Sequence, residues 1–333
     1  MSEDQRTGAA YWIDHYVVPT ADVSRWGSFY TNVLGATPRV DEDRPDRAGR
    51  PLRMLFTYLG RECHVGGSVY DGVLAPGTGL PKYGWFIRQE EIDEHLRRLD
   101  ANAVPHTDPI RTSEEGEDGS AIRFTDPDGN ALELWAPVRM PDGAMEGETS
   151  AKVGRIASAM FESRDLGKTT DFYSRFCGLD PLRSDDLAGD TVVFPLGAAG
   201  RLAFKQVERL AGRTGGHAVY RALHTALVVR DDEFVPTLER MYRELPEWDF
   251  DPATPPTLTP QEAGALSART GIHGNPIGPE WKGTFGRGDS FWDWDTNGYH
   301  FVAGSPVRGS MASFEPASQR KFLEVRRASA AGA

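Results

Sequence analysis

Apolar residues along the chain alternate between the spacing typical of strands and the spacing typical of helices. Residues 11–18 (YWIDHYVV) form a short apolar run that predicts a strand. Apolar residues then recur every three or four positions from Val23 to Val33, which predicts an amphipathic helix. Asp22 stands where a helix N-cap is expected, and Gly35 stands where such a helix ends. Strands are predicted next around residues 37–40, 54–59 and 62–65, so this first unit has the order βαβββ.

The same order of elements recurs three more times. The second, third and fourth units open with strands near residues 83, 155 and 223, and Glu90, Asp165 and Asp231 precede apolar positions at helical spacing. The first and third helices end alike, 143 residues apart, in the pairs Phe29 and Phe172, Tyr30 and Tyr173, and Gly35 and Gly178. A repeat of this length indicates structural modules. The sequence therefore predicts an α+β fold of four βαβββ modules.

A Pro- and Gly-rich segment at residues 136–152 predicts a domain boundary. Residues 1–145 are expected to form one domain of two modules, with the metal site, and residues 150–310 a second, degenerate one. The fourth module contains an insertion near residues 248–278, which is either a lid or contact surface or plain surface decoration. Residues 311–333 are expected to be a tail.

One hairpin carries a candidate functional carboxylate. Residues 126–130 (DPDGN) have the composition of a tight turn. Alternation along the following strand places Leu132 and Leu134 on one face and Glu133 on the other. A carboxylate in the middle of a strand indicates either a solvated face or a bound cation.

Equivalent positions in the four modules suggest which residues share a site. The first position lies on each opening strand, seven residues before the acid that opens the helix. The second lies on each last strand, four residues after a glycine. The first position is occupied by His15, Tyr83, Ser158 and His224, and the second by His64, Glu133, Phe204 and Val302. The residue types that can bind a metal are therefore concentrated in the first half of the chain.

His15, His64 and Glu133 are predicted to bind one divalent metal ion. Two imidazoles and a carboxylate on one side of a metal leave positions open, as in non-haem Fe(II) oxygenases. Imidazoles disfavour Mg²⁺ and Ca²⁺, so Fe(II) is favoured and Mn, Zn, Co and Ni remain alternatives. Tyr83 is the candidate catalytic residue, as a weak fourth ligand or a hydrogen-bond donor to substrate, and the alternative is that it is simply an aromatic wall. His224 is an alternative ligand if the first module pairs with the fourth, and His300 could join it by a register slip.

These features resemble the vicinal oxygen chelate superfamily, which includes glyoxalase I, fosfomycin- and bleomycin-resistance proteins and type I extradiol dioxygenases. The resemblance rests on the βαβββ repeats, the histidine on the opening strand, FYxxxLG at residues 29–35 and DPDGNxLEL at residues 126–134. It implies two glyoxalase-like domains with cupped mixed sheets. Extradiol dioxygenases usually carry the metal in the second half, where this chain has Ser158, His224 and Val302. We therefore expect the working site in the first half.

The resemblance implies three candidate functions. Four modules in one chain are similar to the extradiol dioxygenases, which favours an Fe(II) enzyme of aromatic compound degradation that cleaves the ring of a catechol-like or hydroxylated heteroaromatic substrate with O2. A glyoxalase-type metal-dependent isomerase or lyase is the alternative, and His64 stands where glyoxalase I has a glutamate. A non-catalytic small-molecule binding protein, as in bleomycin resistance, is the third.

Composition narrows the partners and the compartment. A net charge of −12 disfavours nucleic acid and anionic membranes as partners. No apolar run approaches the length of a membrane span, and the first ten residues do not have the pattern of a signal peptide. Two cysteines cannot build a disulfide framework, so a cytoplasmic protein is expected. The identity of the small-molecule substrate and the formation of a homo-oligomer stay open.

Overall fold

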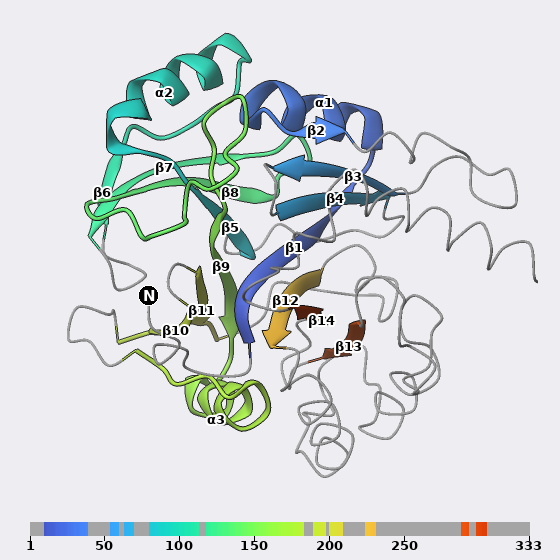
Figure 1. Cartoon of the computed structure of the whole chain (residues 1–333), viewed down its shortest axis with the longest axis vertical. Helices are drawn as coiled ribbons and strands as arrows, with labels where there is room; N and C mark the ends of the chain where they lie inside the picture. Colours follow the sequence, from blue (N-terminus) through green and yellow to red (C-terminus); the bar gives the residue numbers. More distant parts are fainter. Residues whose placement is uncertain are drawn as a thin grey trace, which may run out of the picture.

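The computed structural model describes residues 10–38, 54–59, 63–69, 80–112, 118–182, 189–197, 200–208, 224–230, 288–292 and 298–304. It shows an α+β fold with two mixed sheets of seven strands each (Figure 1). In the order of pairing, sheet A contains β13 (Gly288–Trp292), β14 (Gly298–Gly304), β12 (His224–Arg230), β1 (Ala10–Thr20), β4 (Cys63–Val69), β3 (Met54–Leu59) and β2 (Thr37–Pro38). Sheet B contains β10 (Thr191–Leu196), β11 (Gly200–Gln206), β9 (Ile156–Ser163), β5 (Lys82–Phe86), β8 (Ala131–Pro137), β7 (Gly119–Thr125) and β6 (Ile110–Thr112).

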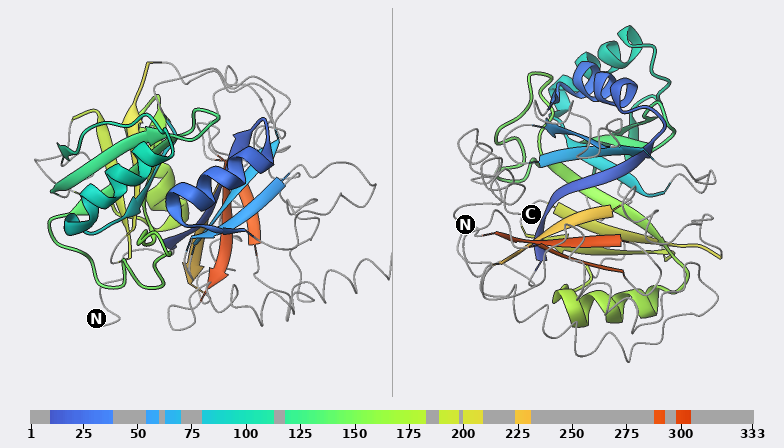
Figure 2. Two further views of the ribbon diagram at one scale, coloured as in Figure 1. Left: turned by 90° about the horizontal axis from the view of Figure 1, so that it is seen from above. Right: turned by 90° about the vertical axis from the view of Figure 1, so that its right-hand side faces the viewer.

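Local sequence determines where the helices begin and end. Helix α1 (Val23–Leu34) starts at Asp22, whose side chain accepts two backbone N–H groups, and stops at Gly35, which has a φ of 67°. Helix α3 (Leu166–Cys177) repeats this arrangement with an aspartate cap and a left-handed glycine. Helix α2 (Ile92–Ala101) follows a 3₁₀ turn, Gln89–Glu91. Helices α1 and α2 lie together at one end of the molecule, and α3 lies at the other end (Figure 1 and the right-hand view of Figure 2).

The sheets join modules that are distant in sequence. β1 pairs with β4 of its own module and with β12 of the fourth, whereas β5 pairs with β8 and with β9 of the third. The expectation that the first two modules share one sheet is therefore corrected: the first module joins the fourth, and the second joins the third.

The connection between β8 and β9 explains this grouping. Phe86, at the end of β5, exchanges two backbone hydrogen bonds with the residues that lead into β9, Gly154 and Arg155. These bonds place the start of β9 beside the end of β5, and the two strands pair antiparallel. A domain boundary between residues 145 and 150 stays a prediction.

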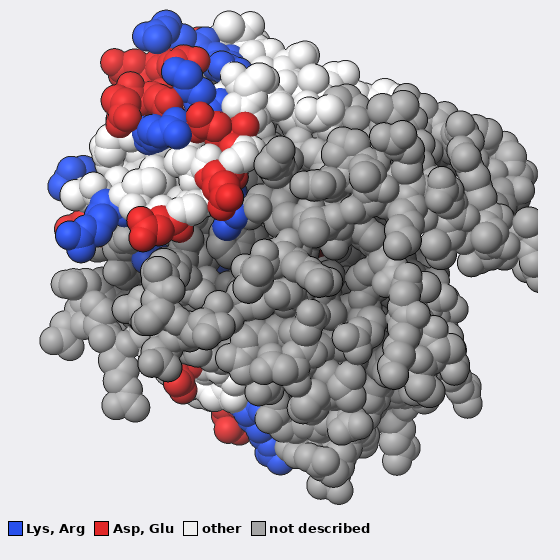
Figure 3. Space-filling model, in the orientation of Figure 1, with Lys and Arg blue, Asp and Glu red and all other residues white. Residues whose placement is uncertain are grey.

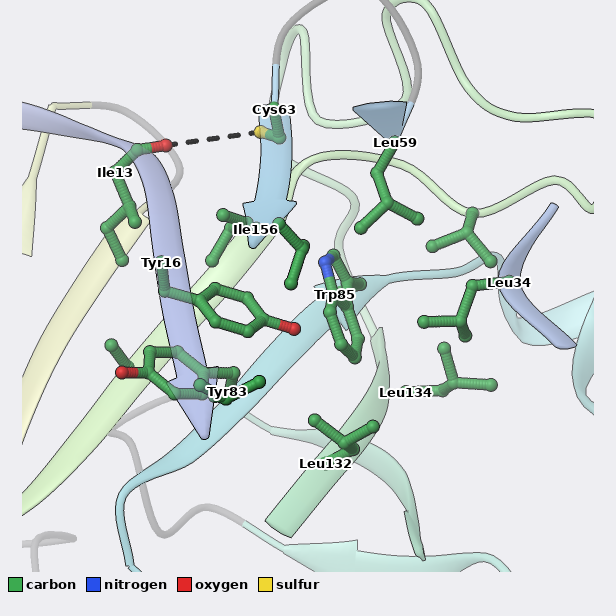
Figure 4. Close-up of a cluster of buried hydrophobic side chains, with 14 of the residues drawn as sticks. Ile13, Tyr16, Leu34, Leu59, Cys63, Tyr83, Trp85, Leu132, Leu134 and Ile156 are labelled. Carbon is green, nitrogen blue, oxygen red and sulfur yellow. Dashed lines mark hydrogen bonds between the residues drawn. The ribbon is translucent and has the colours of Figure 1, made fainter. Parts of the chain in front are cut away.

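The largest hydrophobic core of the described residues lies between the two sheets and includes side chains of all three α-helices. Tyr16 of β1 stacks on Tyr83 of β5, with ring centroids 3.7 Å apart, and Trp85 is the next aromatic neighbour (Figure 4). Such a ring pair adds roughly 1 kcal/mol beyond the area that it buries. Cys63 is also buried here and packs as a small apolar residue beside the backbone of Ile13. The sheets are therefore held face to face by large side chains from both.

Ion pairs attach the segment between β8 and β9 to α2 and to the residue before the 3₁₀ turn. Lys152 Nζ lies 3.0 Å from a Glu94 carboxylate oxygen, and Arg88 lies 2.6 Å from Glu148. Figure 3 shows acidic and basic side chains interspersed over this part of the described surface.

The DPDGN turn joins the two sheets at their edge. Asp128 accepts hydrogen bonds from Thr20, the Ala21 backbone and Arg25, all around the start of α1. Asn130 donates to the backbone oxygen of Pro19. The motif therefore connects the β7–β8 hairpin of sheet B to the end of β1 in sheet A.

Several predictions concern residues outside the described ranges. They are the insertion near 248–278, the helix that opens at Asp231 and the tail at 311–333. Among the described helices, none combines the length and hydropathy that a membrane crossing requires.

We predict that Asp126 makes stability depend on pH. Burial is the main cause that raises the pKa of this carboxyl from 3.8 to about 6. A raised pKa in the folded state stabilises the fold below pH 3.8, and this contribution is lost as the pH rises to about 6, by on the order of 3 kcal/mol. Asp126→Asn removes that dependence, although it also loses the hydrogen bond from Asn130 at every pH.

The measurement is the free energy of unfolding in urea at pH 4, 5, 6 and 7. The difference between wild type and Asp126→Asn should shift in favour of the variant as the pH rises. A difference that stays constant would show that the buried carboxyl does not change its protonation state over this range.

Candidate metal centre

The central pairing of sheet A places two histidines side by side. β1 and β4 run parallel, and in their register His15 lies opposite His64. The two imidazole rings are stacked, with centroids 4.2 Å apart and planes inclined by 23°. Both side chains project from the face of sheet A opposite to Tyr16, and thus away from the shared core. We call the face of each sheet that points away from this core its outer face.

A β-bulge brings a carboxylate to the same place. The register between β1 and β12 shifts between Ile13 and His15, so Asp14 is an extra residue on β1. Such an insertion redirects a side chain that regular alternation would send to the other face. Asp14 Oδ2 lies 2.7 Å from His15 Nδ1 and 3.9 Å from His64 Nδ1.

The three side chains fit a metal ion. Each offers one ligand atom, and these atoms all lie within 4.8 Å of one another. Asp14 is 1% exposed, His15 7% and His64 4%. Asp14 Oδ1 is buried without a hydrogen-bond partner among the described residues, which is costly for a carboxylate unless another group completes the site. Oδ2 can hold His15 in place while Oδ1 provides a ligand atom.

Aromatic residues of β3 enclose the histidines. The ring of Phe56 meets the rings of His64 and His15 edge-on, at 5.0 and 6.0 Å between centroids. Tyr58 meets His64 at 6.2 Å. These rings lower the local polarity around the candidate ligands, which strengthens electrostatic interactions there.

Glu133, the predicted carboxylate ligand, lies on the other sheet. Its Oε2 atom is 3.0 Å from Lys82 Nζ and 2.9 Å from Arg123 Nε. The cause is the module pairing, because β8 belongs to sheet B whereas β1 and β4 belong to sheet A. The structure therefore assembles His15 and His64 as predicted, and it places Asp14 beside them instead of Glu133.

Tyr83 lies in the core instead of on an outer face. It is fully buried against Tyr16, and its hydroxyl is 3.0 Å from Thr225 Oγ1. Tyr83 was identified from the sequence by counting back seven residues from the acid that opens the helix, taken as Glu90. The N-cap of α2 is Glu91, so the equivalent position is one residue later. Seven residues before Glu91 is Gly84, which pairs with Glu133 as His15 pairs with His64. The structure thus gives no support for a catalytic role of Tyr83.

The fourth module enters sheet A beside β1. His224 lies opposite Val17 in the backbone register, two residues along β1 from His15. His300 lies opposite Ala226, which itself lies opposite His15. The backbone thus places His300, Ala226, His15 and His64 in one row across the sheet, whereas the side chains of His224 and His300 lie outside the described part.

Comparison with known proteins agrees with this architecture. Residues 12–134 match the model of the Glyoxalase/Bleomycin resistance protein/Dioxygenase superfamily. The first part of the chain is therefore similar to that superfamily. The match includes Asp14, His15, His64 and Glu133. No curated protein matches the sequence.

Two solved structures share the fold over nearly the whole chain. One is glyoxalase I from Zea mays, with a TM-score of 0.58 and 15% identity over 92% of this chain and 97% of that chain. The other, from Bacillus subtilis subsp. subtilis str. 168, is described as a "putative dioxygenase" and has a TM-score of 0.57 and 16% identity over 95% of this chain and 96% of that chain. At these identities the likeness establishes the glyoxalase-like fold and not the reaction.

Sequence reasoning missed Asp14, although a signal was present. An aspartate within the apolar run YWIDHYVV breaks the strand pattern, and a polar residue beside a histidine can mark a bulge. The two histidines were identifiable because they occupy matching places in the first module.

We predict that substitutions at Asp14 and Glu133 affect metal binding differently. Asp14→Asn keeps the size of the side chain and removes its charge, so the affinity for a divalent ion should fall at least tenfold. His15→Ala and His64→Ala should reduce it further, since each removes a ligand. Metal content is measured by elemental analysis after dialysis against a defined free metal concentration.

Glu133→Gln is the matched control. This substitution also removes one negative charge from a buried carboxylate. Metal content should nevertheless stay at the wild-type level, because Glu133 lies in the other sheet. Circular dichroism checks that each variant is folded. Loss of metal in Glu133→Gln together with retention in Asp14→Asn would restore the assignment made from the sequence.

Proposed function

We propose that the protein is a metal-dependent enzyme that acts on a small molecule with two vicinal oxygens, and that it is an Fe(II) ring-cleaving dioxygenase of a catechol-like or hydroxylated heteroaromatic compound. The observation that carries the proposal is the buried set of two imidazoles and one carboxylate on the outer face of sheet A. This donor set is the one used by non-haem Fe(II) oxygenases. The similarity of residues 12–134 to the superfamily model and the fold shared with the protein described as a "putative dioxygenase" support the same class.

The residues of the chain have separable roles in this proposal. Asp14 fixes the orientation of the His15 ring through the bond to Nδ1. His15 and His64 present nitrogen ligands from adjacent strands, whose pairing keeps the rings in place before any ion binds. Phe56 provides an apolar surface against which a planar ring can pack. When bound, a divalent ion would supply Lewis-acid chemistry and, if it is iron, reactivity towards O2.

A glyoxalase-type isomerase or lyase is the second candidate. Two imidazoles and one carboxylate also suit Zn²⁺, with one position left for substrate or water. The fold shared with glyoxalase I from Zea mays agrees with this class. The two candidates differ in one observable, because an isomerase or lyase consumes no oxygen.

Oxygen uptake tests the proposal. Protein reconstituted anaerobically with Fe(II) is mixed with a panel of catechols and hydroxylated heteroaromatic compounds, and O2 consumption is followed with an electrode. We expect uptake with at least one vicinal dihydroxy compound, in an amount equal to the substrate consumed. His15→Ala should lower the rate at least a hundredfold, because it removes a metal ligand.

Two results would contradict the dioxygenase. A protein that binds the metal but takes up no oxygen with any compound of the panel favours the glyoxalase-type reaction. A protein whose ligand binding is unchanged in His15→Ala, His64→Ala and Asp14→Asn is better described as a non-catalytic binding protein.

A further inference from the structure

One histidine is buried where α2 meets the segment between β8 and β9. We call residues 144–155 of that segment the strap. His95 of α2 is 2% exposed, and neither of its ring nitrogens has a hydrogen-bond partner among the described residues. Buried polar atoms are ordinarily satisfied, because one without a partner costs free energy. His95 takes no part in the candidate metal centre, so its burial requires a separate explanation.

Polar contacts attach the strap to both neighbouring helices. On the α2 side, Lys152 Nζ lies 3.0 Å from a carboxylate oxygen of Glu94, the residue before His95. On the α1 side, Thr149 Oγ1 donates a hydrogen bond to the backbone oxygen of Leu34, the last residue of that helix. The strap therefore joins the C-terminal end of α1 to the turn of α2 that carries the buried imidazole.

The strap is closely packed and locally strained. Lys152 has a φ of 58°, a left-handed conformation that is costly for a residue with a side chain. Gly35 approaches the strap so closely that an added Cβ atom would lie 2.7 Å from the Cβ of Ala151. A strained backbone of this kind persists only where the surrounding contacts hold it in place. Loss of the contacts on one side would therefore favour release of the strap.

The surroundings of His95 oppose its protonation. Burial is the main cause that lowers the pKa of this imidazole from 6.5 to about 4, and the cations Arg98 of α2 and Lys152 of the strap lower it as well. The Glu94 carboxylate and the backbone of Lys152 act in the opposite direction without outweighing burial. Glu91, on the 3₁₀ turn, lies 3.6 Å from Lys152 Nζ. The remaining acids of the strap form ion pairs of their own: Glu146 with Arg155, and Glu148 with Arg88.

We propose that the strap is an acid-sensitive latch, in which protonation of His95 releases residues 144–155 from α2 and from the end of α1. In the released state the imidazole reaches water, and its pKa returns to about 6.5. Because the pKa is lower in the closed state, the latch is most stable above pH 6.5 and loses stability as the pH falls towards 4. Asp126 acts in the opposite direction, since the raised pKa of its carboxyl stabilises the fold as the pH falls.

Hydrogen exchange at the amides of the strap tests the latch. The N–H of Lys152 donates to the backbone oxygen of Thr149 and the N–H of Val153 to Thr149 Oγ1, so both amides report opening. Exchange rates at pH 7 and pH 5, corrected for the intrinsic effect of pH, give the equilibrium constant of opening. This constant should rise about twentyfold on acidification in the wild type, and it should not change in His95→Leu or His95→Gln, which cannot be protonated.

His106→Gln is the matched control. His106 also contacts α2, through Asp100, but a hydrogen bond with the Thr107 backbone raises its pKa, so this variant should keep the full response of the strap to pH. Opening that does not depend on pH in the wild type, or that responds equally in His95→Leu and His95→Gln, overturns the latch. An NMR titration in which the His95 ring of the folded protein is already protonated at pH 6 overturns it as well.

Discussion

The register of strand β1 is the constraint on which the structure depends. β1 is hydrogen-bonded on both sides, to β4 in parallel and to β12 antiparallel, so a shift by one residue would exchange its two faces. One face contributes Tyr16 to the core, and the other contributes His15 to the candidate metal centre. The bulge at Asp14 adds the carboxylate without breaking either pairing. A single strand thus couples the packing of the molecule to its chemistry.

The exchange of modules between sheets follows from the same geometry. Tyr16 and Tyr83 come from different sheets and stack in one core, so the two sheets are packed as a unit rather than as two independent layers. Each sheet is left with an outer face, and the matched positions on these faces differ in chemistry. Sheet A presents histidines and an aspartate, whereas sheet B presents a carboxylate that Lys82 and Arg123 already neutralise. The two related sheets therefore present different chemistry at matched positions.

Local elements of the fold could be predicted from the sequence, and their long-range pairing could not. The caps at Asp22 and Gly35 and the hairpin around Gly129 are determined by neighbouring residues. Which module pairs with which depends on contacts between distant segments, and the repeats are too similar in pattern to distinguish the alternatives. The sequence therefore groups Glu133 with His15 and His64 because its strand has the expected alternation, whereas the structure places that strand in the other sheet. Asp14 was not predicted because strict alternation assigns neighbouring residues to opposite faces, whereas a bulge places Asp14 beside His15.

Anomalous X-ray scattering from crystals grown with Mn²⁺ or Fe²⁺ tests the central claim most directly. Data collected at the absorption edge of the metal locate the ion without reference to activity. The predicted result is one peak bounded by Asp14, His15 and His64 on the outer face of sheet A. A peak beside Glu133 between β5 and β8, or no peak at a saturating metal concentration, would contradict the account.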